Sequence, residues 1–230
     1  MRDALATTHT IFNDRMQDIE IYFSILENES VPRSRNETAI LRATTTLLFY
    51  NMIEATIKNL FFDFYVALGR RPFEQLSVEL QTLYIDLRLT ENDPFTAKHD
   101  TYIKKSEDVI KSILYPGGVS MPVSRQDKNG FKKVNKGGGN LDISTIQNLF
   151  NRHGIDTTDI RFPGCMSTIK NERNALSHGS KTFVEVGSHK ELEGPEGLKK
   201  EKMDIKKVLE ELIEKVSHVL QELENQTIAI

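Results

Sequence analysis

An arginine and a histidine five positions apart lie near the predicted end of a helix. The stretch from Met166 to Gly179 contains Arg173 and His178, and Gly179 can adopt the left-handed backbone conformation that ends a helix. His178 then lies at the helix C-terminus, where the negative end of the helix dipole favours the imidazolium form. Arg173 is permanently charged and presents a planar fork that matches a phosphate group.

These two side-chain types fit the cleavage of RNA by transesterification. A histidine can take the proton from a ribose 2′-hydroxyl or give one to the leaving 5′-oxygen. An arginine can stabilise the charge that builds up on the phosphoryl oxygens. The scheme requires no metal ion, and the carboxylates of the chain show no clustering typical of a metal site. We therefore expect neither a metal nor another cofactor.

The spacing of this pair is weak evidence on its own. Arg2 and His9 form a similar, looser pair that we interpret as a chance match. The end of an apolar helix, with Asn174 after the arginine and Gly179 after the histidine, makes the pair more specific. The alternative is a surface helix end without a function.

Composition narrows the class of protein. The chain has 230 residues, 38% of them hydrophobic, and we expect one domain spanning residues 1–230. With a net charge of −3, the protein as a whole has no positive electrostatic potential that would attract RNA, so any contact with RNA requires a local patch of basic residues. The single cysteine, Cys165, excludes a disulfide framework and fits a reducing cytoplasm. Residues 1–10 lack a signal-peptide core, and polar residues interrupt the most apolar stretch, 39–68, so we expect no membrane span.

The hydrophobic pattern predicts an all-α fold, an up-and-down helical bundle. Strand signals are scarce, and apolar residues recur with the period of a helix. Expected helices cover about 8–26, 36–68, 72–87, 96–114, 144–152, 165–178 and 203–224. The helix at 36–68 is apolar around most of its circumference, which is typical of a helix at the centre of a bundle. Ser144 is the expected N-cap of its helix, and 179–198 is expected to be turn-rich, with a short extended piece at 182–186.

Residues 115–142 differ from the rest of the chain. They contain two prolines and six of the 13 glycines, and five basic residues against two acidic ones. Such a segment is typical of a flexible insertion, and its basic residues have two interpretations. They are either a solvated surface or an RNA-contacting flap that includes Lys132 and Lys133.

The motif resembles the signature of the HEPN superfamily, which is all-helical and includes nucleases and nucleotide-binding proteins. That signature is an arginine, a polar residue, and a histidine after four to six intervening positions, as in Arg173-Asn174-x-x-x-His178-Gly179. Residues 50–60 are similar to the early core helix of the family, which carries an acidic residue facing the site. Residues 139–155 resemble the helix before the motif in bacterial MAE-type HEPN-like nucleases. The resemblance covers about 41–220 and implies a HEPN-type bundle with additional helices.

The resemblance implies a role for each matching residue. Arg173 and His178 become the catalytic pair, supported by Asn174. Glu54 would orient one of them from the neighbouring helix, although a salt bridge at a packing edge is the alternative. Asn51 and Lys58 share the face of Glu54. The candidates for RNA binding are Lys58, Lys170, Lys132 and Lys133.

The resemblance also implies an activity and partners. We expect a metal-independent endoribonuclease that leaves a 2′,3′-cyclic phosphate and a 5′-hydroxyl, acting as a toxin of a toxin–antitoxin pair or as a phage-defence effector. Its partners would be RNA, an antitoxin protein, and a second copy of the chain in a homodimer with a composite active site. The alternatives are a non-catalytic nucleotide-, RNA- or partner-binding module and a purely structural bundle.

His153, directly before Gly154, is interpreted separately from this site. We expect it at the end of a helix, with a secondary contact to RNA as the alternative.

Overall fold

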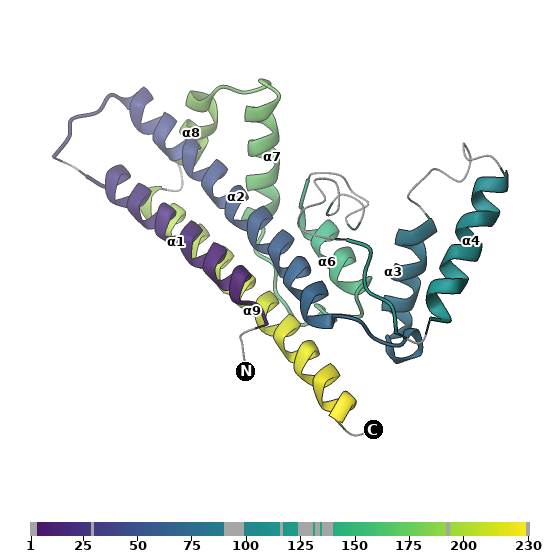
Figure 1. The fold of residues 1–230 in the computed structure, drawn as a ribbon. Helices are drawn as coiled ribbons and strands as arrows, with labels where there is room; N and C mark the ends of the chain where they lie inside the picture. The colour runs from purple at the N-terminus through teal and green to yellow at the C-terminus, as the bar shows by residue number, and fades with distance from the viewer. Residues whose placement is uncertain are drawn as a thin grey trace.

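Helices make up the secondary structure of the chain (Figure 1). The computed structural model describes residues 4–28, 30–89, 99–115, 117–123, 131, 134, 140–191 and 194–228. Its elements are α1 (Ala6–Leu26), α2 (Arg35–Leu68), the 3₁₀ helix η1 (Phe73–Gln75), α3 (Val78–Leu89), α4 (His99–Ile113), α6 (Ile143–Asn151), α7 (Cys165–Ser177), α8 (Phe183–Glu191) and α9 (Gly194–Ile228). No strand forms in the described ranges, where a single isolated bridge joins Arg71 and Val119. The prediction of an all-α fold is confirmed.

The central helix is α2, as its apolar circumference predicts. A capping box starts it: the Ser34 hydroxyl accepts from the Glu37 backbone N–H, and the Glu37 carboxylate accepts from the Ser34 N–H. Gly69, at a φ of 60°, ends it. Between these ends α2 contacts α1, α7, α8 and α9, so four other elements are positioned by one helix.

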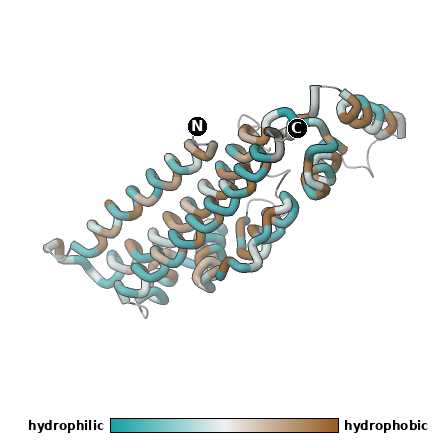
Figure 2. Tube along the Cα trace, turned by 90° about the horizontal axis from the view of Figure 1, so that it is seen from below, coloured by the Kyte–Doolittle hydropathy of each residue, from teal (hydrophilic) through white to brown (hydrophobic). Residues whose placement is uncertain are grey.

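The three longest helices, α1, α2 and α9, lie side by side along the molecule (Figure 1). Lys202 of α9 forms an ion pair with Glu20 of α1. Lys199 of α9 forms an ion pair with Glu27, the C-cap of α1, so both lysines connect the two helices. Figure 2 shows hydrophobic and hydrophilic residues alternating along these helices, as expected where each helix buries only part of its surface.

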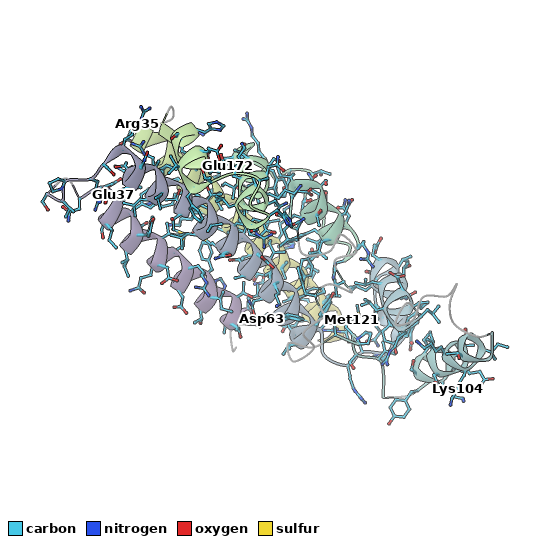
Figure 3. All side chains as sticks on the ribbon, turned by 90° about the horizontal axis from the view of Figure 1, so that it is seen from above. Arg35, Glu37, Asp63, Lys104, Met121 and Glu172 are labelled. Carbon is cyan, nitrogen blue, oxygen red and sulfur yellow. The ribbon has the colours of Figure 1, made fainter. Side chains whose placement is uncertain are left out.

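Helix pairs lie toward the two ends of α2, and α6 lies between these pairs (Figure 1). Helices α7 and α8 pack near the N-terminal half of α2, whereas α3 and α4 form a pair beyond its C-terminal end (Figure 1). Figure 3 labels Glu172 of α7 and Lys104 of α4, far apart in the molecule. The residues that could do chemistry on α7 are therefore positioned by its packing against α2 and α8.

Three expectations about local structure are wrong. Residues 182–186 are not extended, because Thr182 and Glu185 form a second capping box that starts α8. Helix α9 begins at Gly194, within the stretch expected to be turn-rich. Asp142, not Ser144, caps α6, because the Asp142 carboxylate accepts the Thr145 N–H.

The segment 115–142 contributes to the core where it is described. Six of its apolar side chains are at most 9% exposed: Val119, Met121, Val123, Phe131, Val134 and Leu141. Lys132 and Lys133 lie outside the described residues. The flexible loop and its contact with RNA therefore stay predictions.

Helix α8 approaches α2 closely at Gly187. A β-carbon at Gly187 would lie 1.7 Å from the carbonyl oxygen of Ala39 and 2.8 Å from its α-carbon. Both atoms belong to the backbone of α2, so they cannot move aside as a flexible side chain can. The absence of a side chain at Gly187 is what allows α8 to pack against the centre of the bundle.

Gly187→Ala is therefore expected to destabilise the fold. Alanine favours a helix over glycine by about 1 kcal/mol, but overpacking against backbone costs about 1–3 kcal/mol and should prevail here. Urea unfolding would measure the net loss, with His189→Ala, an exposed position on the same helix, as the control. A Gly187→Ala protein as stable as the wild type would contradict the close approach.

Candidate active site

Helix α7 ends at the residues that the motif predicts. Ser177 is its last residue, His178 is the C-cap, and Gly179 follows at a φ of 68°. The Ser180 N–H donates to the Ala175 carbonyl at 2.9 Å, and the Gly179 N–H donates to the Leu176 carbonyl at 3.2 Å. This pair of bonds is a Schellman motif, which a left-handed glycine makes possible.

The His178 side chain is exposed at this helix end. Among the described residues, its imidazole takes part in no hydrogen bond or ion pair. Both ring nitrogens are therefore available to a ligand, and one can accept a proton while the other donates.

Arg173 lies one turn earlier and is partly buried. Its guanidinium carbon lies 4.5 Å from the centre of the Tyr50 ring of α2. Its Nη1 donates to Asn174 Oδ1 at 3.0 Å and faces Asn140 Oδ1 at 3.4 Å. The arginine is thus held by an aromatic face and two amide oxygens.

Tyr50 was not among the predicted site residues. It is fully buried, and its hydroxyl accepts the Leu141 N–H at 3.1 Å. Burial raises the pKa of Tyr50; the Leu141 N–H and Arg173 oppose that shift, and Glu54 adds to it. Both Glu54 and Arg173 therefore lie close enough to act on the Tyr50 phenol.

Arg173 and His178 do not contact each other within the chain. Each residue of a helix turns the chain by about 100°, so a separation of five positions places the side chains of Arg173 and His178 about 140° apart around the helix axis. Arg173 faces Tyr50, whereas His178 faces solvent. One chain therefore presents the two groups on different sides of the helix end, and not as a joined pair.

Lys170 forms an ion pair with Asp142 at 3.5 Å, with 24% of its side chain exposed. Partial burial alone would raise the pKa of Asp142, but hydrogen bonds from Thr145 and Ser144, together with Lys170, lower it to about 2. The carboxylate is consequently charged at neutral pH. Lys170 would have to leave this partner, or share it, to contact RNA.

The remaining α2 residues predicted for the site line one depression. Asn51, Glu54 and Lys58 line it together with Arg15 of α1 and Asn59. No hydrogen bond or ion pair joins Glu54 to Arg173 or His178 among the described residues. The orienting role of Glu54 stays a prediction, supported so far only by its closeness to Tyr50.

The sequence matches the model of a known protein family. The family model described as HEPN_MAE_28990-like HEPN matches residues 4–226. The chain belongs to this HEPN family. No curated protein and no solved structure matches it. HEPN membership indicates a nuclease-related or RNA-related module.

Behind the motif, this HEPN chain buries a charged network that the sequence did not indicate. The Lys190 ammonium lies 2.9 Å from Glu201 Oε2 and 3.5 Å from Glu172 Oε2. The Thr46 hydroxyl donates to Glu172 Oε2 at 3.2 Å. These side chains come from α2, α7, α8 and α9, so the network fixes the rotation of α7 on its neighbours. Glu172 is directly before Arg173, and Figure 3 shows it among the helices.

His153 is not a surface residue of this HEPN chain. It is 1% exposed, and the Leu149 carbonyl at 2.6 Å can only accept, so Nδ1 carries the hydrogen. Nε2 then accepts from the Tyr65 hydroxyl, also at 2.6 Å. Burial lowers the pKa of His153 to about 3, so the ring is neutral. The position at a helix end is confirmed, but burial makes the alternative of an RNA contact wrong.

Within the described part of the chain, no group of three or more His, Cys, Asp or Glu side chains is arranged to hold a metal ion. None of the described helices is both long enough and apolar enough to cross a bilayer.

Proposed function

We propose that this HEPN protein is a metal-independent endoribonuclease with Arg173 and His178 as its catalytic residues. One observation carries the proposal: an anchored arginine and an exposed histidine are displayed together at the capped end of α7. The guanidinium would bind a phosphate of the RNA. The imidazole would move a proton at the ribose or at the leaving group.

The chemical step is attack of a ribose 2′-oxygen on the adjacent phosphorus. The bond from the 2′-oxygen to phosphorus forms as the bond from phosphorus to the 5′-oxygen breaks. A base removes the proton of the 2′-hydroxyl, and an acid protonates the 5′-oxygen. The products are a 2′,3′-cyclic phosphate and a 5′-hydroxyl. Arg173 would stabilise the charge on the phosphoryl oxygens.

The base and the acid act on opposite sides of the phosphorus, whereas each chain offers one His178. We therefore propose a homodimer in which two copies of the α7 end form one composite cleft. A two-fold axis brings the same residues of both chains together. One His178 would then act as the base and the other as the acid.

Supporting roles follow from the contacts around α7. Asn174 holds Nη1 of Arg173, and the depression with Asn51, Glu54 and Lys58 offers polar groups to the RNA. The basic residues Lys170, Lys132 and Lys133 are proposed to bind the RNA backbone. We also propose that the protein acts in the cytoplasm as a toxin or phage-defence effector controlled by an antitoxin protein.

The test is cleavage of single-stranded RNA by the purified protein in excess EDTA. We expect cleavage to continue, because the proposed scheme uses only side chains, and we expect fragments ending in a 2′,3′-cyclic phosphate. End-group analysis by mass spectrometry would identify these products. Cleavage that stops with EDTA and returns with added metal would contradict the mechanism. Binding of RNA without cleavage would support the non-catalytic alternative.

A further inference from the structure

The guanidinium of Arg173 is held on one side only. Within the described residues, all its hydrogen bonds go through Nη1, to Asn174 and Asn140. Its guanidinium carbon lies over the Tyr50 ring, 4.5 Å from the ring centre. The donors Nε and Nη2 remain, and they point along the same edge of the guanidinium. That edge matches two oxygens of one phosphate.

Tyr50 is itself unable to turn. It is fully buried in α2, and its hydroxyl is bonded to the backbone of Leu141. The plane of the ring is thus set by the bundle and by the segment that enters α6. An arginine stacked on such a ring loses less side-chain freedom on binding a ligand than one in open solvent, because its freedom is already restricted.

We propose that Tyr50 is a positioning residue for Arg173, which it holds so that Nε and Nη2 bind one phosphate of the RNA with two hydrogen bonds. This inference rests on the proposed function, because it assigns a task within the same site. Asn140 and Asn174 assist by anchoring Nη1. A purely structural Tyr50 would fill the core and stack on Arg173 without affecting the binding of phosphate.

The experiment is a double-mutant cycle on binding, since binding can be measured in variants that do not cleave. The probe is a fluorescent 2′-O-methyl oligoribonucleotide, which lacks the attacking hydroxyl. Its affinity is measured by anisotropy for the wild type, Tyr50→Leu, Tyr50→Phe, Arg173→Ala and the double variant Tyr50→Leu/Arg173→Ala. Melting temperatures are measured alongside, because leucine leaves the core less full.

Tyr50→Leu is expected to weaken binding about tenfold, the size of a desolvated stacking contact. Tyr50→Phe keeps the ring and should remain within about threefold of the wild type. In the Arg173→Ala background, Tyr50→Leu should change the affinity by less than about twofold, because the group it positions is gone. Equal losses in both backgrounds, or an equal loss in Tyr50→Phe, would overturn the proposal.

A second variant covers the case in which Tyr50→Leu does not fold. Asn140→Ala removes one acceptor of Nη1 and leaves the core intact. Asn140→Ala should weaken binding of the probe when it is made in the wild type, and it should not change the affinity of the Arg173→Ala protein. An affinity that Asn140→Ala changes in neither protein would count against the proposal. The proposed function fails separately, if the wild type neither binds the probe nor cleaves RNA. A wild type that binds and cleaves, with additive variants, would refute only the positioning role.

Discussion

Replacing His178 with alanine should lower the rate of RNA cleavage by about 10²–10⁴-fold, the usual contribution of a general acid or base. The side chain is exposed and caps α7 in a conformation that alanine also adopts. The change therefore removes the proton-transfer group without removing packing, and the melting temperature should stay near that of the wild type. Single-turnover cleavage of a labelled RNA would measure the effect.

His218→Ala is the matched control for this variant. His218 is an exposed histidine of α9 beside Glu222, with 69% of its side chain accessible, and it takes no part in the proposed site. Its removal should leave cleavage unchanged. If His178→Ala cleaved as fast as His218→Ala, the site would be assigned to the wrong histidine.

Arg173 should behave differently from His178. Arg173→Ala is expected to reduce cleavage by about 10²–10³-fold, as for loss of a group that stabilises developing charge, and also to weaken binding. Arg173→Lys keeps the charge but loses the planar fork. It should therefore recover only part of the binding. Full activity in Arg173→Lys would show that only charge matters at this position.

The composite cleft can be examined with the same histidine variant. His178→Ala chains mixed in excess with wild-type chains should form mixed dimers that lack either the base or the acid. With RNA in excess over all chains, cleavage per wild-type chain should fall as the variant is added. Unchanged cleavage after subunits have exchanged would contradict a shared site.

The largest expected effect on stability comes from Lys190. Lys190→Met keeps much of the side-chain volume but leaves the buried carboxylates of Glu172 and Glu201 without the ammonium that both contact. Breaking a buried ion pair by removing one partner costs about 3–5 kcal/mol. We expect a loss of this size in the free energy of unfolding, measured in urea. The rotation of α7 should also become less well defined, because Glu172 precedes Arg173.

Lys207→Met is the matched control, since the same change is made on α9 at an exposed ion pair with Glu211, where 77% of the lysine side chain is accessible. Pairs of that kind contribute about 0–1 kcal/mol. The variant Lys190→Met/Glu201→Gln removes one buried charge and should recover part of the lost stability. A Lys190→Met protein that unfolds like Lys207→Met would show that the network is not buried in solution.

Much of the helical layout could be predicted from short-range signals. The Ser34 and Glu37 capping box and Gly69 mark the two ends of α2, and Gly179 marks the end of α7. Thr182 and Glu185 form the same kind of start signal for α8, but the threonine, phenylalanine and valines around them favour an extended interpretation. Packing of α8 against α2, with Gly187 at the contact, decides in favour of the helix.

The site was only partly predictable. Arg173 and His178 follow from the motif, whereas the role of Tyr50 depends on a contact with Leu141, 91 residues away. No local pattern indicates that contact. A lysine near a helix end is usually solvated; Lys190 is buried because glutamates from α7 and α9 converge on it.

The distance in sequence between the parts of this site has a consequence for protein synthesis. Thr46 and Glu172, which hydrogen-bond in the folded chain, are 126 residues apart. During translation, α2 emerges long before α7, and Lys190 follows later still. Until then, Tyr50 has no guanidinium to hold and Glu172 has no ammonium beside it. The charged network behind the motif therefore assembles only after the ribosome has passed the codon for Lys190.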